Sequence, residues 1–364
     1  MKICFIGSAN SSHLVKWCHW FAERGHELHV ISFTPGDIPD ADIHLIDLKV
    51  DVNGSDIGKW KYLTTGKQIK KLVHEINPDI INVHYATSYG IAVALSGMRN
   101  YVLSVWGSDI YDFPGKSLIH RMMLKYSLKK ARYLFSTSQS MAKEASQYTN
   151  KPFAITPFGV DIELFHPNKR TRQANDSSFV IGTVKTLSDL YGIDCILRAA
   201  SILIREVPQM NLSVRICGSG PQEKEYRDLA QHLGISKAVT FTGRISQEEA
   251  AREWANMDVA VIPSVRYESF GVAAVEAQAC GIPVVISDVD GLKETTRPGE
   301  TSIVTAKKAD KEIADAVLKL YQDSALRIKM GRNGRAFVER TYELNTCFSR
   351  IELLLKQCCL QQKR

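Results

Sequence analysis

The feature that most constrains the fold is an alternation that continues along the whole chain. Short runs of β-branched and aliphatic residues are separated by stretches with the periodicity of amphipathic helices. Strands that alternate with helices form a parallel sheet covered by helices on both faces. The chain is therefore predicted to be an α/β protein. Its expected strands are 2–7, 27–33, 43–48, 79–84, 101–105, 133–137 and 153–156 in the first half, and 179–184, 212–217, 239–242, 259–263 and 283–286 in the second.

One segment, residues 166–178, breaks the alternation because it is polar and has no periodicity. It predicts a linker between an N-terminal domain, residues 1–165, and a C-terminal domain, residues 179–342. The same scheme restarts after the linker, so we expect two Rossmann-like domains. The last helical stretch, residues 345–360, carries apolar residues at helical spacing and needs a surface to cover.

Composition excludes several classes of protein. The 364 residues are 45% hydrophobic and 23% charged, which is typical of globular domains and excludes a largely disordered chain. The apolar run before Gly7 is too short for a signal peptide and none is long enough to span a bilayer, so we expect a cytoplasmic protein. The eight cysteines have no metal-binding spacing and are expected to be reduced. The adjacent Cys358 and Cys359 leave lipidation or a redox role open as an alternative to ordinary helix-end residues.

Glycine-containing loops follow several of the expected strands in the second half. In parallel sheets such loops lead to helix N-termini, whose free N–H groups favour phosphate. A phosphate-containing ligand is therefore the natural candidate for this edge of the sheet. The loop residues expected to bind it are Gly182, Thr183, Gly218, Gly243, Arg244, Ser269, Phe270, Gly271 and Val272, together with Lys185, which can meet phosphate as a point charge.

Two glutamates, Glu268 and Glu276, flank the start of the helix that follows Gly271. Carboxylates accept hydrogen bonds from sugar hydroxyls, so the pair suits a sugar and a ribose on either side of a diphosphate. The alternative is that Glu268 caps the helix and Glu276 is a solvated helix residue. The chain has neither a strict Gly-x-Gly-x-x-Gly nor a Walker sequence, which argues against a nicotinamide dehydrogenase and a P-loop ATPase.

The run from 268 to 285, ESFGVAAVEAQACGIPVV, resembles the Glu-x7-Glu signature of retaining glycosyltransferase family 4. Other segments follow in the order that this family has. They are Gly7-Ser8 with His13, Gly25-His26-Glu27, the run 79–84, Gly107-Ser108-Asp109, Pro157 to Asp161, Gly218 to Pro221, and Gly243-Arg244. The resemblance therefore covers almost the whole chain.

The resemblance implies the GT-B fold, with two facing Rossmann-like domains, a cleft between them and a last helix that crosses back to the N-terminal domain. The C-terminal domain is then expected to bind a nucleotide-diphosphate sugar, with Glu268 on the sugar and Glu276 on the ribose. The amides of residues 270–273 would hold phosphate, and the base would lie near Gly243-Arg244. The reaction is expected to retain configuration and to need no metal or other cofactor. Asp288 and Asp290 have the Asp-x-Asp spacing that offers a metal site as an alternative.

Two positions depart from the pattern of the family. Thr183 and Tyr191 stand where its members usually carry an arginine and a lysine facing the diphosphate, so Lys185 is expected to be the main cation for the leaving group. Trp106 precedes Gly107-Ser108-Asp109 where a histidine is common. It is either a platform for a sugar ring or a core residue.

The N-terminal domain is expected to bind the acceptor, with Asp109 as a catalytic residue beside Glu268 and Lys185. The acceptor-side candidates are Gly7, Ser8, His13, His84 and Trp106. Each histidine and Asp109, considered alone, has a structural role as its alternative.

The net charge of +7 lies mainly in the first half of the chain and in its tail. Residues 113–143 contain seven Lys or Arg and no acid, with Arg121, Lys125, Lys129 and Arg132 at helical spacing. Ile119, Met122, Met123 and Tyr126 mark another side of the same helix. The pattern of residues 116–132 predicts a contact with an anionic membrane surface, the alternative being a solvated helix. It lacks the aromatic interleaving of a nucleic-acid site, so no nucleic acid is expected.

These features predict a retaining, metal-independent glycosyltransferase that moves a sugar from a nucleotide-diphosphate sugar to a saccharide or lipid-linked saccharide. A role in cell-surface polysaccharide biosynthesis and a peripheral place on the inner face of the membrane are expected with it. Two alternatives remain. One is a sugar-nucleotide epimerase of the same fold, and the other is a non-catalytic subunit that binds a sugar nucleotide.

Overall fold

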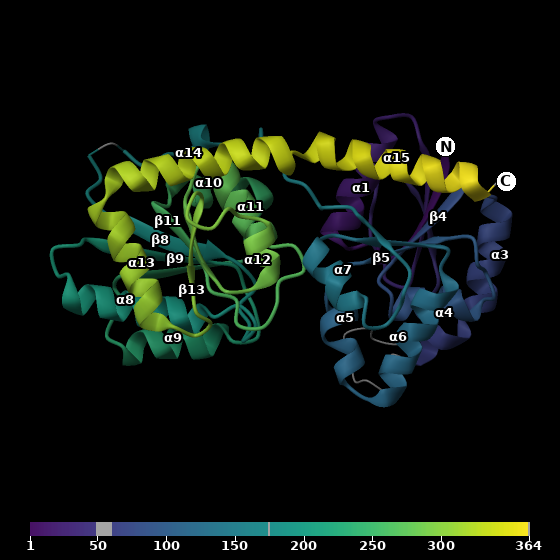
Figure 1. The fold of residues 1–364 in the computed structure, drawn as a ribbon, viewed down its shortest axis with the longest axis horizontal. Helices are drawn as coiled ribbons and strands as arrows, with labels where there is room; N and C mark the ends of the chain where they lie inside the picture. Colours follow the sequence, from purple (N-terminus) through teal and green to yellow (C-terminus); the bar gives the residue numbers. More distant parts are fainter. Residues whose placement is uncertain (49–59, 174, 363–364) are drawn as a thin grey trace. The chain divides into compact units, whose positions relative to one another are not determined.

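The computed structural model describes residues 1–48, 60–173 and 175–362. Contacts between Cα atoms divide the chain into two compact units. The first unit is Met1–Phe158 with Cys347–Arg364, and the second unit is Gly159–Thr346. Each unit has its own parallel sheet with helices on both faces (Figure 1). The predicted α/β class with two Rossmann-like domains is therefore confirmed.

The first unit has a seven-stranded parallel sheet in the order β3-β2-β1-β4-β5-β6-β7. Its strands are β1 (Lys2–Ile6), β2 (Glu27–Ser32), β3 (Asp42–Leu45), β4 (Ile80–His84), β5 (Val102–Val105), β6 (Tyr133–Ser136) and β7 (Phe153–Ile155). Its helices are α1 (Ser12–Ala22), η1 (Trp60–Thr64), α3 (Gly66–Ile76), α4 (Ser88–Leu95), α5 (Ser108–Tyr111), η2 (Phe113–Gly115), α6 (Leu118–Lys130) and α7 (Gln139–Ala145). The strand order reverses between β1 and β4, which is where doubly wound sheets bind ligands.

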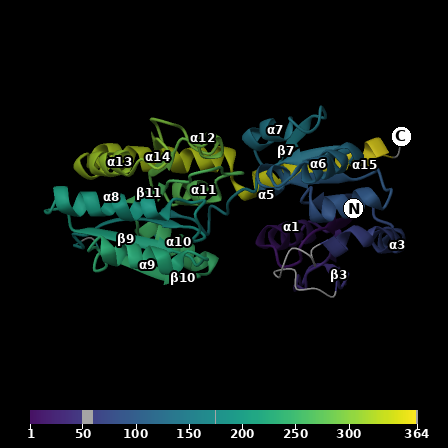
Figure 2. The ribbon, with the colours of Figure 1, turned by 90° about the horizontal axis from the view of Figure 1, so that it is seen from below.

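The second unit has a six-stranded parallel sheet in the order β10-β9-β8-β11-β12-β13, which reverses between β8 and β11. Its strands are β8 (Phe179–Val184), β9 (Leu212–Cys217), β10 (Val239–Gly243), β11 (Val259–Ile262), β12 (Val284–Ser287) and β13 (Ser302–Thr305). Its helices are η3 (Pro167–Lys169), α8 (Ile193–Glu206), α9 (Glu223–His232), α10 (Gln247–Asn256), α11 (Val272–Ala279), α12 (Asp290–Glu294), α13 (Asp310–Gln322) and α14 (Ser324–Thr341). Helix α8 packs against α9 and α13, and α11 packs against α10 and α14; Figure 2 shows these elements from below.

Strand β13 is not indicated by the sequence pattern. It has only four residues, and polar Ser302 and Thr305 stand at its ends, so its hydrophobic signal is weak. The structure buries both side chains, because β13 pairs in parallel with β12 at the edge of the sheet. Pairing with a neighbour, rather than local composition, makes this segment a strand.

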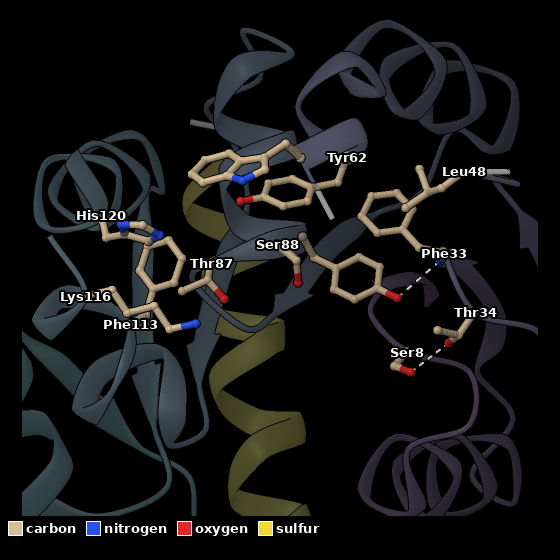
Figure 3. Close-up of a pocket in the computed structure, with 12 residues that line it drawn as sticks. Ser8, Phe33, Thr34, Leu48, Tyr62, Thr87, Ser88, Phe113, Lys116 and His120 are labelled. Atoms are coloured by element: carbon tan, nitrogen blue, oxygen red, sulfur yellow. Dashed lines mark hydrogen bonds between the residues drawn. The ribbon is translucent and has the colours of Figure 1, made fainter. Parts of the chain in front are cut away.

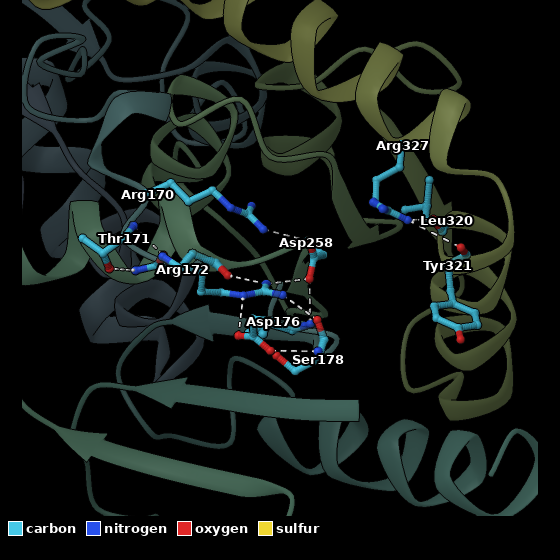
Figure 4. A network of polar contacts seen from close by, with 11 residues as sticks. Arg170, Thr171, Arg172, Asp176, Ser178, Asp258, Leu320, Tyr321 and Arg327 are labelled. Atoms are coloured by element: carbon cyan, nitrogen blue, oxygen red, sulfur yellow. Dashed lines mark hydrogen bonds and ion pairs between the residues drawn. The ribbon is translucent and has the colours of Figure 1, made fainter. Parts of the chain in front are cut away.

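The segment expected as a linker, residues 166–178, lies within the second unit, apart from residue 174, which is outside the described residues. Arg172 holds it there (Figure 4). The Arg172 guanidinium donates to Asp258 Oδ2 at 2.7 Å and to the Asn256 carbonyl at 2.9 Å, and it also bonds the Ser178 carbonyl. The polar composition of the segment therefore provides hydrogen bonds to the second unit, and the division between the units falls earlier, at Phe158.

The last helix, α15, spans Leu344–Gln362, and its residues from Cys347 onward belong to the first unit. Phe348 packs edge-on against Trp17 and Trp20 of α1, with ring centroids 5.9 and 5.6 Å away. Glu352 accepts a hydrogen bond from His26 at 2.8 Å. Cys358 and Cys359 are both buried, as expected of ordinary residues on the packed side of a helix. In the described part of the chain, no helix is long and apolar enough to cross a membrane.

Candidate functional site

The reversal of strand order in the second unit brings Lys185 and Glu268 together. Lys185 follows β8 and Glu268 follows β11, the two strands that flank the reversal. Lys185 Nζ lies 2.7 Å from Glu268 Oε1, and their side chains are only 13% and 7% exposed. The Ser264 hydroxyl donates to the same carboxylate oxygen at 2.8 Å. Two residues chosen independently from the sequence thus form one buried ion pair at the expected ligand-binding edge of the sheet.

The environment of Lys185 keeps its side chain charged. Burial is the largest influence and lowers the pKa of the lysine. The charge of Glu268, the hydrogen bond to it and the charges of Tyr191 and Glu276 together outweigh burial, so the pKa of Lys185 is raised above its ordinary value. The ammonium lies over the Tyr191 ring, 4.4 Å from its centroid. Lys185 therefore presents a full positive charge at neutral pH.

Helix α11 begins at Val272, four residues after Glu268. Gly271 is its N-cap residue and has φ of +80°, a conformation that glycine adopts without strain. The first amides of a helix have no acceptor within the helix, so this start offers N–H groups to an anion. The predicted phosphate-binding residues Ser269, Phe270 and Val272 lie in the same turn. The loop that carries Glu268, the ion-pair partner of Lys185, thus leads into this helix start.

Glu276 lies one turn further along α11 and is buried. Its Oε2 accepts a hydrogen bond from the indole Nε1 of Trp254, on α10, at 3.2 Å. Both alternatives considered for the two glutamates are wrong: Glu276 is not a solvated helix residue, and Glu268 pairs with Lys185 instead of capping α11. A buried carboxylate beside a helix start remains available to meet polar groups of a ligand.

The loops after β8, β9 and β10 are held to one another by backbone hydrogen bonds. Lys185 N–H donates to the Cys217 carbonyl at 2.8 Å, and Gly218 N–H donates to the Gly243 carbonyl at 2.9 Å. Gly218 has φ of +132°, and a Cβ atom there would lie 2.1 Å from the Lys185 carbonyl oxygen. Only glycine permits this approach, so Gly218 fixes where the Lys185 loop runs.

The other predicted residues of this edge have different surroundings. Gly182 lies within β8, where a Cβ atom would come 2.2 Å from the Arg215 carbonyl oxygen of the neighbouring strand. Thr183 is buried in β8, and Arg244 is exposed after β10. The sequence could not separate Gly182, which allows strands to pack, from Gly218, which allows loops to pack.

Asp288 and Asp290 both form ion pairs with Lys293 of α12. Lys293 Nζ lies 2.6 Å from Asp288 Oδ1 and 2.9 Å from Asp290 Oδ1. Among the residues that the structure describes, no group of three or more His, Cys, Asp or Glu side chains is arranged to hold a metal ion.

In the first unit, Asp109 organises the loop after β5. Its Oδ1 accepts from the N–H groups of Trp106 and Gly107 at 3.2 and 2.8 Å, and its Oδ2 accepts from Ala86 N–H at 2.9 Å. The carboxylate is almost completely buried, and burial raises the pKa of Asp109 although these hydrogen bonds oppose the change. These contacts are those of a positioning residue that joins the loops after β4 and β5.

His84, Trp106 and His13 form an aromatic cluster. The ring of His84 is centred 4.2 Å from Trp106 and 5.0 Å from Trp17, and His13 stacks on Phe158 at 3.8 Å. Trp106 is thus packed as a core residue, which answers the question that the sequence left open. Burial lowers the pKa of His84 to about 3 and that of His13 to about 4, so both rings are neutral at pH 7.

This burial of His84 makes the stability of the first unit depend on pH. An unfolded chain binds the His84 proton below pH 6.5 and the folded chain only near pH 3, so stability falls as the pH drops through this window. The slope reaches about 1.4 kcal/mol per pH unit for each such group. In urea titrations followed by tryptophan fluorescence, we expect His84→Phe to flatten the pH dependence of the urea midpoint between pH 6.5 and 4. The substitution removes no hydrogen bond, because neither ring nitrogen of His84 has a partner among the residues that the structure describes.

The matched control for this substitution is His74→Phe, at an exposed position on α3 of the same unit. It should leave the pH dependence of the urea midpoint unchanged. Equal slopes for His84→Phe and the parent chain would show that His84 is not the group responsible.

A cavity of about 450 Å³ opens at the carboxyl edge of the first sheet (Figure 3). Of the acceptor-side residues expected from the sequence, only Ser8 lines it. Gly7 lies behind, against His84, where a Cβ atom would come 3.2 Å from His84 Cβ. The remaining lining residues are Phe33, Thr34, Leu48, Trp60, Tyr62, Thr87, Ser88, Tyr89, Phe113, Lys116 and His120. These come from helices and loops far apart in the sequence, and no local motif marks them.

The lining of the cavity combines aromatic faces with hydroxyl groups and two cationic or titratable side chains. Phe33 and Tyr89 stack with ring centroids 4.4 Å apart, and the Tyr89 hydroxyl accepts from Phe33 N–H at 3.1 Å. In Figure 3, Lys116 and His120 lie on one side of the cavity and Ser8 and Thr34 on the other. Aromatic faces and hydroxyls together suit a sugar ring, and a cation suits an attached anionic group.

Comparisons with known proteins agree with this architecture. The family model "Glycosyl transferase 4-like" matches residues 2–138, and "Glycosyl transferases group 1" matches residues 166–337. A D-inositol 3-phosphate glycosyltransferase of Corynebacterium jeikeium (strain K411) is 35% identical over 52% of this chain and 48% of that protein. The match thus spans about half the length of such relatives. The same-named protein of Arthrobacter sp. (strain FB24) is 32% identical over 73% of this chain and 71% of its own length.

The structure of Anabaena HepE in complex with UDP and glucose is similar in fold, with a TM-score of 0.81 and 19% sequence identity, and the match covers 98% of this chain and 99% of that chain. The likeness supports the GT-B fold with two Rossmann-like domains, as the sequence predicted. The two family models, over residues 2–138 and 166–337, and the relative matched over more than two thirds of its length agree on one family. The protein therefore belongs to the group 1, glycosyltransferase 4-like family of GT-B proteins.

Proposed function

We propose that the chain is a retaining, metal-independent glycosyltransferase that moves a sugar from a nucleotide-diphosphate sugar to a saccharide or lipid-linked saccharide, in cell-surface polysaccharide biosynthesis. One observation carries the proposal: Lys185 forms a buried ion pair with Glu268, in the loop that leads to the start of α11. A fixed cation and free helix amides are what a departing diphosphate needs. The names of the matched proteins support the reaction class, and the UDP and glucose bound to HepE support a UDP-sugar as donor.

In this mechanism the second unit binds the donor. Breaking the anomeric bond places negative charge on the diphosphate, and the Lys185 ammonium with the first amides of α11 would stabilise that charge. Glu268 would accept a hydroxyl of the donor sugar and hold Lys185 in place, and Glu276 would accept a ribose hydroxyl. Because Lys185 remains charged in its buried site, no proton has to move for it to act. The leaving phosphate would take the proton of the acceptor.

The first unit would hold the acceptor in its aromatic cavity. Ser8 and the side chains of the cavity would contact the acceptor sugar. Asp109 would act as a positioning residue, because its carboxylate fixes the backbone of the loops after β4 and β5. His13, His84 and Trp106 would support these loops from behind as a neutral aromatic cluster.

A thermal-shift comparison of UDP, GDP and their sugars tests donor binding. At about one hundred times its dissociation constant, a ligand that binds only the folded chain stabilises it by about 2.7 kcal/mol. We expect a UDP-sugar to raise the melting temperature of the parent chain and Lys185→Ala to lose most of that increase. An unchanged increase in Lys185→Ala over a concentration series would contradict the placement of the diphosphate.

Incubation with the donor alone separates the alternatives. A new sugar-nucleotide isomer formed without acceptor would indicate the epimerase. Binding without hydrolysis or transfer would indicate the non-catalytic subunit. Transfer or slow hydrolysis that disappears in Glu268→Ala is the result expected of the transferase.

A further inference from the structure

Trp254 and Glu276 are joined across two helices in the core of the second unit. Trp254, on α10, is completely buried, and Glu276, on α11, is 8% exposed. The indole Nε1–H of Trp254 donates to Glu276 Oε2 at 3.2 Å. An indole group only donates, whereas the two oxygens of a carboxylate have about four positions at which they accept. The contact therefore fixes one oxygen of Glu276 and uses only part of the capacity of the carboxylate to accept hydrogen bonds.

The need of a buried indole for a partner does not explain why that partner is a carboxylate. A backbone carbonyl would accept the same hydrogen bond, and burying a charge costs more free energy than burying a neutral acceptor. Trp17, in the first unit, is buried although its Nε1 has no hydrogen-bond partner among the residues that the structure describes. The core of this chain thus tolerates an unpaired indole N–H. We infer that Glu276 has a use of its own and that Trp254 serves it.

The nature of the donor indicates what that use requires. A lysine or arginine in the place of Trp254 would neutralise the charge of Glu276. An indole N–H orients the carboxylate and leaves its negative charge, so Glu276 stays a strong acceptor for hydroxyl groups. The charge of Glu276 also contributes to the raised pKa of Lys185, so the two side chains interact. Glu276 is therefore an oriented, charged acceptor in the same site as Lys185.

The helix that carries Trp254 is firmly held. Helix α10 packs against α11. On the side of the sheet, Arg215 of β9 donates from Nε to Glu253 Oε2 at 3.0 Å, one residue before Trp254. At the end of α11, the thiol of Cys280 contacts the Ala251 carbonyl oxygen at 3.7 Å, which ties the two helices together. A side chain whose own position is locked by packing can hold its partner within narrow limits.

We propose that Trp254 is a positioning residue for the ribose of the nucleotide donor and acts through Glu276. The inference rests on the proposed function, in which Glu276 accepts a hydrogen bond from a ribose hydroxyl. Because the N–H of Trp254 orients the carboxylate before the nucleotide arrives, binding does not have to order the side chain of Glu276. Loss of this N–H should therefore weaken the recognition of the ribose and leave the affinity for the rest of the nucleotide unchanged.

Isothermal titration calorimetry with UDP, 2′-deoxy-UDP and 3′-deoxy-UDP tests the proposal. The parent chain should bind UDP about tenfold or more tightly than the analogue that lacks the hydroxyl recognised by Glu276. Trp254→Phe keeps an aromatic ring and removes the N–H. It should weaken UDP binding by about threefold to tenfold and leave the affinity for that analogue within about twofold of the parent value.

The kinetics of transfer give a second measure of the same change. In Trp254→Phe the KM for the donor should rise by the factor that UDP binding loses, and kcat should stay within about twofold. This split is expected because the ribose is held equally in the ground state and in the transition state. Damage to the fold alone would weaken UDP and both deoxy analogues by the same factor.

A double variant shows whether Trp254 acts through Glu276. Glu276→Ala should bind UDP and the deoxy analogue with similar affinity, and the addition of Trp254→Phe should change neither value further. Two matched controls complete the set. Trp17→Phe removes an indole N–H that has no partner in the described part of the chain, and Ser264→Ala removes a hydrogen bond to Glu268 instead of Glu276. Both should keep the parent ratio of the two affinities within about twofold.

A spectroscopic measurement needs no substitution at Trp254 and so remains informative if Trp254→Phe does not fold. The parent chain has five tryptophans, and labelling them with nitrogen-15 gives one indole N–H resonance for each. The resonance that moves most in Glu276→Gln belongs to Trp254. Saturation with UDP should shift this resonance, and saturation with the deoxy analogue that lacks the recognised hydroxyl should shift it less.

The outcomes separate this inference from the proposed function. If the parent chain distinguishes UDP from a deoxy analogue and Trp254→Phe keeps the same ratio of affinities, the role of Trp254 is wrong and the proposed function stands. A Trp254 resonance that UDP leaves in place has the same meaning. A parent chain that does not bind UDP, or that binds UDP and both deoxy analogues equally, would contradict the placement of the donor and, with it, the role of Trp254.

Discussion

Replacing Lys185 with methionine should lower sugar transfer by about a thousandfold, since a single preorganised charge at the leaving group contributes about 2.7–4 kcal/mol to transition-state stabilisation. The same change should lower the free energy of unfolding by about 3–5 kcal/mol, because it leaves the Glu268 carboxylate buried without its partner. Glu268→Gln should also lower transfer strongly. Initial rates at saturating donor and urea titrations measure the two effects separately.

The double variant Lys185→Met/Glu268→Gln distinguishes catalysis from folding. Removing both charges should restore most of the stability that Lys185→Met loses, since a neutral pair needs no buried counter-charge, but it should restore none of the activity. Lys293→Met is the matched control, because Lys293 also bridges two carboxylates of the second unit but does so at the surface. It should change stability by no more than about 1 kcal/mol and leave transfer nearly unchanged. Recovery of transfer in the double variant would mean that Lys185 serves folding alone.

The second large effect is expected for Gly218→Ala. The added Cβ atom would meet the Lys185 carbonyl oxygen at 2.1 Å, in a backbone conformation with φ of +132° that alanine rarely adopts. Either the Lys185 loop moves or the strand end distorts. We expect a loss of stability of about 3 kcal/mol or more, together with loss of the thermal shift produced by a UDP-sugar.

Gly234→Ala serves as the control for this variant. Gly234 also has a positive φ, +71°, but a Cβ atom there would have no neighbour within 4 Å. Gly234→Ala should lower the free energy of unfolding by about 1 kcal/mol, from backbone strain alone, and leave ligand binding unchanged. Similar losses of stability in both variants would show that the backbone conformation of Gly218, and not its contact with the Lys185 loop, accounts for the destabilisation.

Much of the candidate donor site is encoded locally. Glu268 and Glu276 are separated by a fixed number of residues on a helix start, and Lys185 comes directly after a buried strand. Strand ends at the same edge of a parallel sheet converge, so these positions could be expected to meet once the strands were recognised. Contacts that depend on the positions of individual side chains could not be predicted from the sequence. An example is the hydrogen bond from Trp254 to Glu276, which joins two helices.

The acceptor side was harder to predict, for a physical reason. Phe33 follows β2, Tyr62 lies in η1 and Phe113 in η2, and nothing in their immediate neighbours marks them as lining one cavity. Conversely, His84 and Trp106 stand at strand ends, where functional residues gather, yet they pack against each other as core. An aromatic residue has the same local signal whether it faces a ligand or another ring.

The sequence by itself determined the α/β class, the division into two Rossmann-like halves and the family, because periodicity and motif spacing are properties of short segments. Only the tertiary structure decided which of these residues touch. It paired Lys185 with Glu268, added β13 to the sheet edge, tied the polar segment to the second unit through Arg172 and left one side of α6 uncovered. Each of these outcomes depends on residues distant along the chain, whose contacts appear only when the strands are ordered in space.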